Sequence, residues 1–228
     1  MTPSFHHRRH WLRRATAVLL AGFTLSARSA MSPATALHEA ATRGDTATLR
    51  QLLDQGAPVD GRDSAGRTAL LAATHANQVE AARLLIAAGA DVNAKDAIQD
   101  SPYLYAGARG HLGILQLTLA HGADLRSTNR YGGTALIPAA ERGHVEAVRT
   151  LIAAGVAVDH INRLGWTALL EAILLSDGGP RHQQIVQLLL AAGANPNLAD
   201  GDGVRPLQHA QQRGYTAMAD LLRAAGGQ

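Results

Sequence analysis

The sequence predicts an all-α repeat solenoid of about six helix-pair repeats behind an N-terminal leader. The main observation is a recurring motif, Thr-Ala-Leu, which begins at Thr35, Thr68, Thr134 and Thr167. Successive copies are therefore 33, 66 and 33 residues apart. Ser101-Pro-Tyr-Leu lies midway along the long step. The chain is rich in alanine, leucine and glycine, which favour short helices joined by glycine-containing turns. A fixed period of about 33 residues indicates stacked units that bury one face on the next.

The segment 1–30 has the pattern of an export signal. A basic stretch that ends at Arg14 precedes an apolar segment over 15–27. This segment is too short to cross the ~30 Å hydrocarbon core of a membrane as a helix. We expect a signal peptide over 1–30, cleaved after Ala27 or after Ala30, where small residues precede the bond.

The leader also resembles the twin-arginine signals of bacteria. In Arg8-Arg9-His10-Trp11-Leu12-Arg13, two arginines precede a free position, an aromatic residue, a leucine and a base. Tryptophan stands where phenylalanine is usual, and arginine where lysine is usual. The resemblance implies export by the twin-arginine route, while the general secretory route stays open. The alternative to an export signal is a disordered basic tail.

The charge balance gives no reason to expect nucleic acid as a partner. The net charge is +3, but five of the 21 basic residues and none of the 18 acidic residues lie in the leader. Residues 31–228 therefore carry 16 basic against 18 acidic side chains, a net charge of −2. A near-neutral body lacks the basic footprint that phosphate binding requires. The absence of cysteine excludes disulfides, thiolate metal ligands and a cysteine nucleophile.

The repeats are expected to start near residues 35, 68, 101, 134, 167 and 205. In each of the first five, the opening threonine or serine caps a first helix through its hydroxyl, and a glycine in the left-handed conformation ends the second helix. Tyr103 occupies the slot of leucines one repeat away, so we expect it in the core. Asn129, Asn162 and Asp200 begin inter-repeat turns, where we expect their side chains to bond the turn backbone.

Repeat five exceeds the period by five residues. The extra residues fall near 176–180, before a second helix that we expect to begin at Gln183. Insertions in repeat arrays map to loops, often near the binding face. Loop length also costs little stability, so a tolerated extension and a functional loop both stay open.

These motifs resemble the ankyrin repeat family over residues 35–226. The resemblance implies stacked helix-turn-helix repeats joined by β-turn loops, with a concave groove lined by the turn tips and the first helices. In that family the groove binds partners, mostly proteins. The leader and the lack of cysteine also resemble exported, periplasmic ankyrin repeat proteins of proteobacteria. We therefore expect a monomeric periplasmic scaffold that binds a partner protein and has no membrane span once the leader is removed.

Arginine and aromatic side chains gather in the middle repeats, at turn tips and at the ends of first helices. These residue types dominate interface hot spots because each buries a large area and keeps a polar group. Glutamates beside them would contribute charge complementarity. The predicted protein-binding residues are Arg109, Arg130, Tyr131, Glu141, Arg142, Arg163, Trp166 and Glu171.

The sequence gives little support for an enzyme. Glu141 and Glu171 fall on first helices of adjacent repeats, and two carboxyls across a groove could support acid–base hydrolysis. An open groove is expected to leave both acids solvated, without the raised pKa of a general acid. No zinc, phosphate-loop or serine-nucleophile motif is present, so we expect no metal and no cofactor. Small-ligand binding or hydrolysis at these glutamates, and a secreted effector or toxin-neutralising protein, remain the alternatives.

Overall fold

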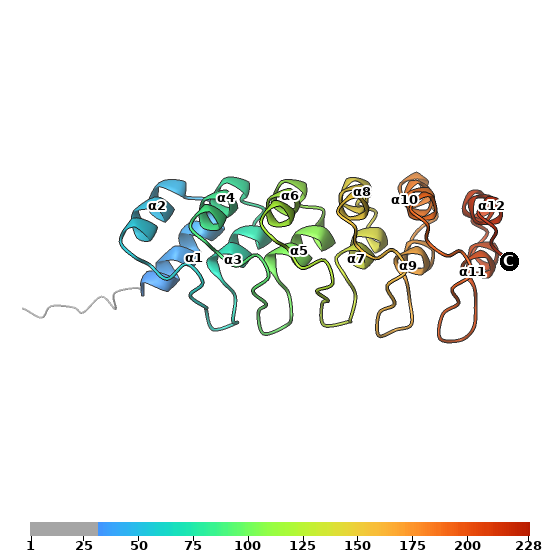
Figure 1. Cartoon of the computed structure of the whole chain (residues 1–228), viewed down its shortest axis with the longest axis horizontal. Coiled ribbons are helices and arrows are strands. Elements are labelled where there is room, and N and C mark those ends of the chain that lie inside the picture. Colours follow the sequence, from blue (N-terminus) through green and yellow to red (C-terminus); the bar gives the residue numbers. More distant parts are fainter. Residues whose placement is uncertain (1–31) are drawn as a thin grey trace, which may run out of the picture. The chain divides into compact units, whose positions relative to one another are not determined.

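Helices alternate between two rows along the described part of the chain (Figure 1). The computed structural model describes residues 32–228, and the predicted signal peptide over 1–30 lies outside them. The helices in this part are α1 (Pro33–Arg43), α2 (Thr46–Asp54), α3 (Ala69–His75), α4 (Val79–Ala87), α5 (Pro102–Arg109), α6 (Leu112–Ala120), α7 (Leu136–Glu141), α8 (Val145–Ala153), α9 (Ala168–Leu174), α10 (Pro180–Ala191), α11 (Pro206–Gln212) and α12 (Thr216–Ala224).

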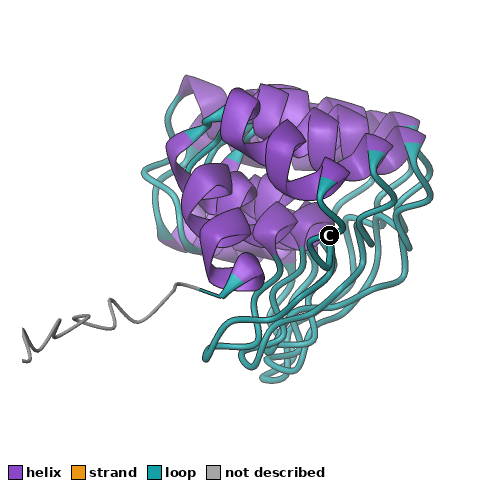
Figure 2. Cartoon of the chain, turned by 90° about the vertical axis from the view of Figure 1, so that its left-hand side faces the viewer, coloured by secondary structure: helices purple, strands orange, loops and turns teal. Residues whose placement is uncertain are grey.

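Each repeat contributes one helix to each row. The first helix of a repeat packs on its own second helix and on the first helix of the next repeat, as α5 does with α6 and α7. The second helices form the other row. The long inter-repeat loops extend past the first helices, away from the row of second helices (Figure 2). Residues 32–228 contain helices and loops without a strand. The predicted all-α repeat solenoid is therefore confirmed.

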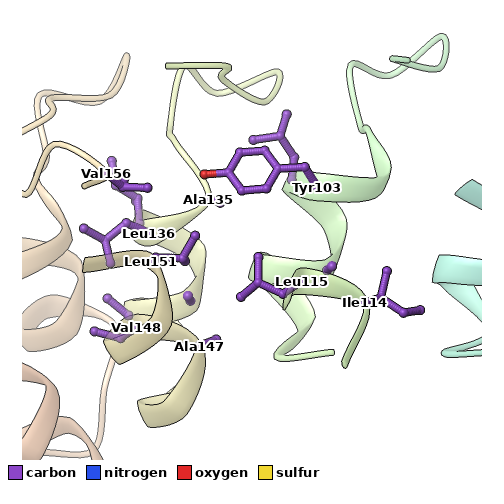
Figure 3. Packing of buried hydrophobic residues seen from close by; sticks show 14 of the residues in the cluster. Tyr103, Ile114, Leu115, Ala135, Leu136, Ala147, Val148, Leu151 and Val156 are labelled. Carbon is purple, nitrogen blue, oxygen red and sulfur yellow. The ribbon is translucent and has the colours of Figure 1, made fainter. Parts of the chain in front are cut away.

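One slot near the start of each first helix supplies the centre of the core. The fully buried side chains in this slot are Leu37, Leu70, Tyr103, Leu136 and Leu169. Tyr103 is buried as predicted, among leucines and alanines of its own and the next repeat (Figure 3). Burial of one such side chain contributes about 1.5–3 kcal/mol, so a repeat depends on its neighbours for much of its stability.

Hydroxyl caps begin three of the first helices as predicted. The side chains of Thr68, Ser101 and Thr167 each accept a hydrogen bond, 3.2 Å long, from the backbone N–H three residues on. The prediction was wrong for Thr35, because α1 starts earlier and Ser32 caps it.

Thr134 is the second exception among the caps. Its hydroxyl has no hydrogen-bond partner among the described residues. Proline at position 138 has no N–H to bond the Thr134 carbonyl, which accepts instead from Ile137 N at 3.3 Å. The helix α7 consequently begins only at Leu136.

The insertion in repeat five was predicted with the wrong helix start. Helix α10 begins at Pro180, not at Gln183, because proline is favoured in the first turn of a helix. The loop before it is tied to repeat six: Tyr215 Oη donates to the Ser176 carbonyl at 2.7 Å, and the Tyr215 ring lies against Gly178. These contacts give the inserted loop a packing role.

Candidate functional site

A hollow of about 380 Å³ lies over the first helices and turns of the middle repeats. We call it the central hollow. Helices α5, α7 and α9 supply its floor, and the turns around Arg130 and Leu164 supply one side. Its lining residues are Asp100, Tyr105, Ala108, Arg109, Asn129, Arg130, Tyr131, Gly133, Ile137, Pro138, Glu141, Arg142, Asn162, Leu164, Glu171 and Leu175.

Six of the eight predicted site residues line this hollow. They are Arg109, Arg130, Tyr131, Glu141, Arg142 and Glu171. The two others, Arg163 and Trp166, are not among its lining residues. Arg163 extends along the neighbouring turn, where its Nη1 donates to the Arg130 carbonyl at 2.7 Å. Its contacts within the described chain therefore brace two turns against each other.

Asparagine side chains hold the turn tips in place. Asn129 Oδ1 accepts hydrogen bonds from the backbone N–H groups of Tyr131 and Gly133, at 2.9 and 3.1 Å. Asn162 and Asp200 bond their own turns in the same way, which confirms the predicted role of all three. The backbone of the turn tips that border the hollow is thus fixed by hydrogen bonds within each turn.

Apolar side chains project from successive turn tips. Ile98, Tyr131 and Leu164 stand one period apart, and each has about half of its surface exposed: 51%, 56% and 56%. Exposed apolar groups in a row are more often interaction sites than isolated ones are. Tyr131 and Leu164 also line the central hollow, so the row continues into its edge.

Two of the arginines in the hollow lie over tyrosine rings. The guanidinium of Arg109 is 5.4 Å from the ring centre of Tyr105, and that of Arg130 is 5.0 Å from the ring centre of Tyr131. Arg130 also approaches Asp100 at 3.8 Å. Burial raises the pKa of the Asp100 carboxyl, while the charge of Arg130 acts in the opposite direction.

Arg142 is anchored differently. Its Nη1 donates to the Ala108 carbonyl of the preceding repeat at 2.8 Å. It forms no ion pair among the described residues, although Glu141 precedes it and Glu171 lines the same hollow. Its side chain is exposed and has further N–H donors besides the one that bonds Ala108.

Glu171 contradicts the expectation that both acids stay solvated. It is only 6% exposed, and its Oε1 accepts a hydrogen bond from Asn162 Nδ2 at 2.8 Å. Burial, together with the charge of Glu141, raises the pKa of Glu171 to about 7. The prediction failed because the walls of the hollow remove water that an open surface would retain.

Sequence reasoning missed part of the lining, most notably Tyr105 and Pro138. These two residues stand one period apart in one column of the first helices, which continues to Glu171. The repeat period could have revealed them, because residues at the same position of successive repeats face the same side of the stack. Leu164 was missed although it follows Ile98 and Tyr131 at the same period.

Comparison with known proteins establishes the family. A family model for ankyrin repeats in three copies matches residues 15–96 and 103–200, which is more than half of the chain. The chain belongs to the ankyrin repeat family. Ankyrin repeats are in general protein-interaction scaffolds, and the homologues are typically non-catalytic.

Solved structures share both fold and sequence with this chain. An ankyrin repeat domain from Acinetobacter baumannii AYE is 66% identical with a TM-score of 0.82, over 84% of this chain and 98% of that one. The ankyrin repeat protein EF0377 is 44% identical with a TM-score of 0.80, over 83% and 97%. The ankyrin repeat domain of Bcl-3, a member of the IkappaB protein family, is 27% identical with a TM-score of 0.77, over 85% and 87%.

A curated relative shows a shorter match. The putative ankyrin repeat protein YahD of Escherichia coli K12 is 56% identical over 57 residues, which is 25% of this chain. The match covers 28% of the length of that relative. Within residues 32–228, no group of three or more metal-ligating side chains comes together, and no helix has the length and hydropathy to cross a membrane.

Proposed function

We propose that the chain is an exported scaffold that binds a partner protein in the periplasm through the central hollow. The observation that carries this proposal is the convergence of three arginines and an exposed row of apolar turn tips on one preformed surface. Arginine and tyrosine are over-represented among residues that dominate binding energy. Because the stack fixes the surface in advance, binding is close to rigid docking.

The hollow is tested by affinity capture with a matched control. The bait is the full chain with a C-terminal tag, mixed with periplasmic extract from the source cells. A Tyr131→Ala/Arg142→Ala variant removes two exposed groups of the hollow. An Arg126→Ala/Arg149→Ala variant removes two exposed arginines that are not among its lining residues.

The first variant should lose at least tenfold in affinity for the captured protein, as expected when hot-spot residues are truncated. The control should bind like the wild type. Equal binding by both variants would place the interface elsewhere. Recovery of no partner by a folded wild-type chain would contradict the proposed function itself.

Export is tested independently of binding. In a bacterium with both export routes, the tagged chain should appear in the periplasm, shortened to begin at Arg28 or Met31. An Arg8→Lys/Arg9→Lys variant should stay uncleaved in the cytoplasm, because the twin-arginine route depends on that pair. An Arg13→Lys/Arg14→Lys variant, with the same charge, should be exported. Export of the first variant would favour the general secretory route, and an uncleaved cytoplasmic wild type would refute export.

A further inference from the structure

Glu171 carries a carboxyl group that forms no ion pair within residues 32–228, although the charge of Arg142 acts on it from beyond ion-pair distance. Its Oε1 is bonded by Asn162, and its Oε2 has no hydrogen-bond partner among the described residues. Glu141 lines the same hollow, and neither glutamate forms an ion pair with any residue of 32–228. A buried side chain therefore presents an unpaired oxygen at the wall of a hollow.

In repeat six, the acid at the corresponding pair of positions has a basic partner within the protein. There the turn residue is Asp200 and the helix residue nine positions on is His209, and their side chains meet at 2.7 Å. In repeat five the equivalent pair is Asn162 and Glu171. The amide donates one hydrogen bond but carries no charge, so the basic partner that repeat six supplies internally is missing from repeat five.

The walls around Glu171 suit the stem of a long basic side chain. Tyr105, Ile137, Pro138 and Leu164 line the hollow with apolar surface. Lysine and arginine lay their methylene groups along such surfaces while the charged end seeks a polar group. The arrangement thus offers apolar contact for a stem and two carboxylates for its head.

We propose that the central hollow receives a lysine or arginine side chain of the partner protein, whose cationic end sits against Glu171 and Glu141. This inference rests on the proposed function and names the chemistry of the partner. The hydrogen bond between two charged groups in a desolvated site is stronger than a neutral one. A partner with a neutral or acidic side chain at this point leaves Glu171 buried and unpaired, which disfavours that partner.

The test begins with a displayed library of random nine-residue peptides, selected on the full-length chain at pH 8. Selected peptides are then synthesised with their basic residue intact or replaced by norleucine, which keeps the stem and removes the charge. Both forms are titrated against the wild type, Glu171→Gln and Glu39→Gln. Glu39 is the equivalent position in repeat one and is exposed, so its variant is the matched control.

The wild type should select peptides that share a lysine or arginine. Norleucine should weaken binding to the wild type and to Glu39→Gln at least tenfold, and binding to Glu171→Gln by a clearly smaller factor, because only the charge of Glu141 is then left beside the cation. Equal losses on all three proteins would overturn the inference.

The result also separates this inference from the proposed function. Peptides that depend on Tyr131 and Arg142 but are indifferent to Glu171→Gln would refute the cation site and retain the binding hollow. Selection of acidic peptides would have the same meaning. Recovery of no peptide would refute both.

Discussion

At Glu171, two influences on one carboxyl add to each other. Burial raises its pKa and the neighbouring charge of Glu141 raises it further, while the hydrogen bond from Asn162 and the charge of Arg142 oppose them. The folded-state pKa of about 7 exceeds the ordinary value of 4.5. Between these two pH values the folded chain holds a proton that the unfolded chain has released, so the free energy of unfolding falls as the pH rises. The loss continues through the folded-state pKa, nears completion by about pH 8, and amounts to roughly 3 kcal/mol at most.

Replacing Glu171 by glutamine should therefore stabilise the protein at high pH alone. The amide oxygen still accepts the hydrogen bond from Asn162, and no charge is buried. Urea unfolding should give a free energy within about 0.5 kcal/mol of the wild type at pH 5, and about 1–3 kcal/mol above it at pH 8. Glu39→Gln should show no such difference between the two pH values. A Glu171→Gln variant that is less stable than the wild type at pH 8 would disprove the assignment.

Among the elements, the inserted loop before α10 depends on one glycine. Gly178 has a φ of +71°, in the left-handed region, and a methyl group on its Cα would lie 2.5 Å from the Tyr215 ring. Gly214 has the same φ of +71° with no atom within 4 Å of such a methyl group. The two positions thus separate the strain of the backbone from the loss of the contact between repeats.

Alanine at Gly214 should cost about 1 kcal/mol of unfolding free energy, the ordinary penalty for a left-handed alanine. Alanine at Gly178 should cost about 3 kcal/mol, because the Tyr215 ring must also move and its bond to Ser176 weakens. Urea unfolding of both variants measures the difference. Equal losses of unfolding free energy would mean that the inserted loop tolerates displacement of Tyr215 and contributes no stability through this contact.

The regular parts of these elements could be predicted because the period repeats in the sequence itself. Thr68 and Thr167 start helices as their motif indicates, and Tyr103 fills a leucine slot. Exceptions follow from local chemistry that the motif does not contain, as where Pro138 removes one backbone donor and delays α7. To predict such a late helix start, one must know which N–H group bonds each carbonyl.

The repeat register predicted which residues line the hollow better than it predicted how deeply each of them is buried. Arg109 and Arg142 share a slot, and both line the hollow. Trp166 shares its slot with Asp100 and Gly133, and of these three only Trp166 is not among the residues that line the hollow, a difference that the register does not predict. The register does not predict the burial of Glu171 either, because it requires walls from α7 and the adjacent turns, which lie outside its own repeat.

At the scale of the whole stack, stability and binding should separate on deletion of one repeat. Each repeat contacts its neighbours alone, so stability is approximately a sum over repeats and their interfaces. Removing 60–92 takes out α3 and α4, and removing 126–158 takes out α7 and α8; each deletion spans one whole period and so keeps the register. Circular dichroism should show about one sixth less helix for either deletion, since two of the twelve described helices are lost, and a lower urea midpoint.

The two deletions should differ in binding. Removal of 60–92 takes away no residue of the central hollow, whereas removal of 126–158 takes Tyr131, Glu141 and Arg142. The first deletion should retain the captured partner and the second should lose it, although both are folded and similarly destabilised. Complete loss of helix in either case would contradict the additive stack. Loss of the partner in both would mean that the binding surface extends beyond the hollow into the segment 60–92.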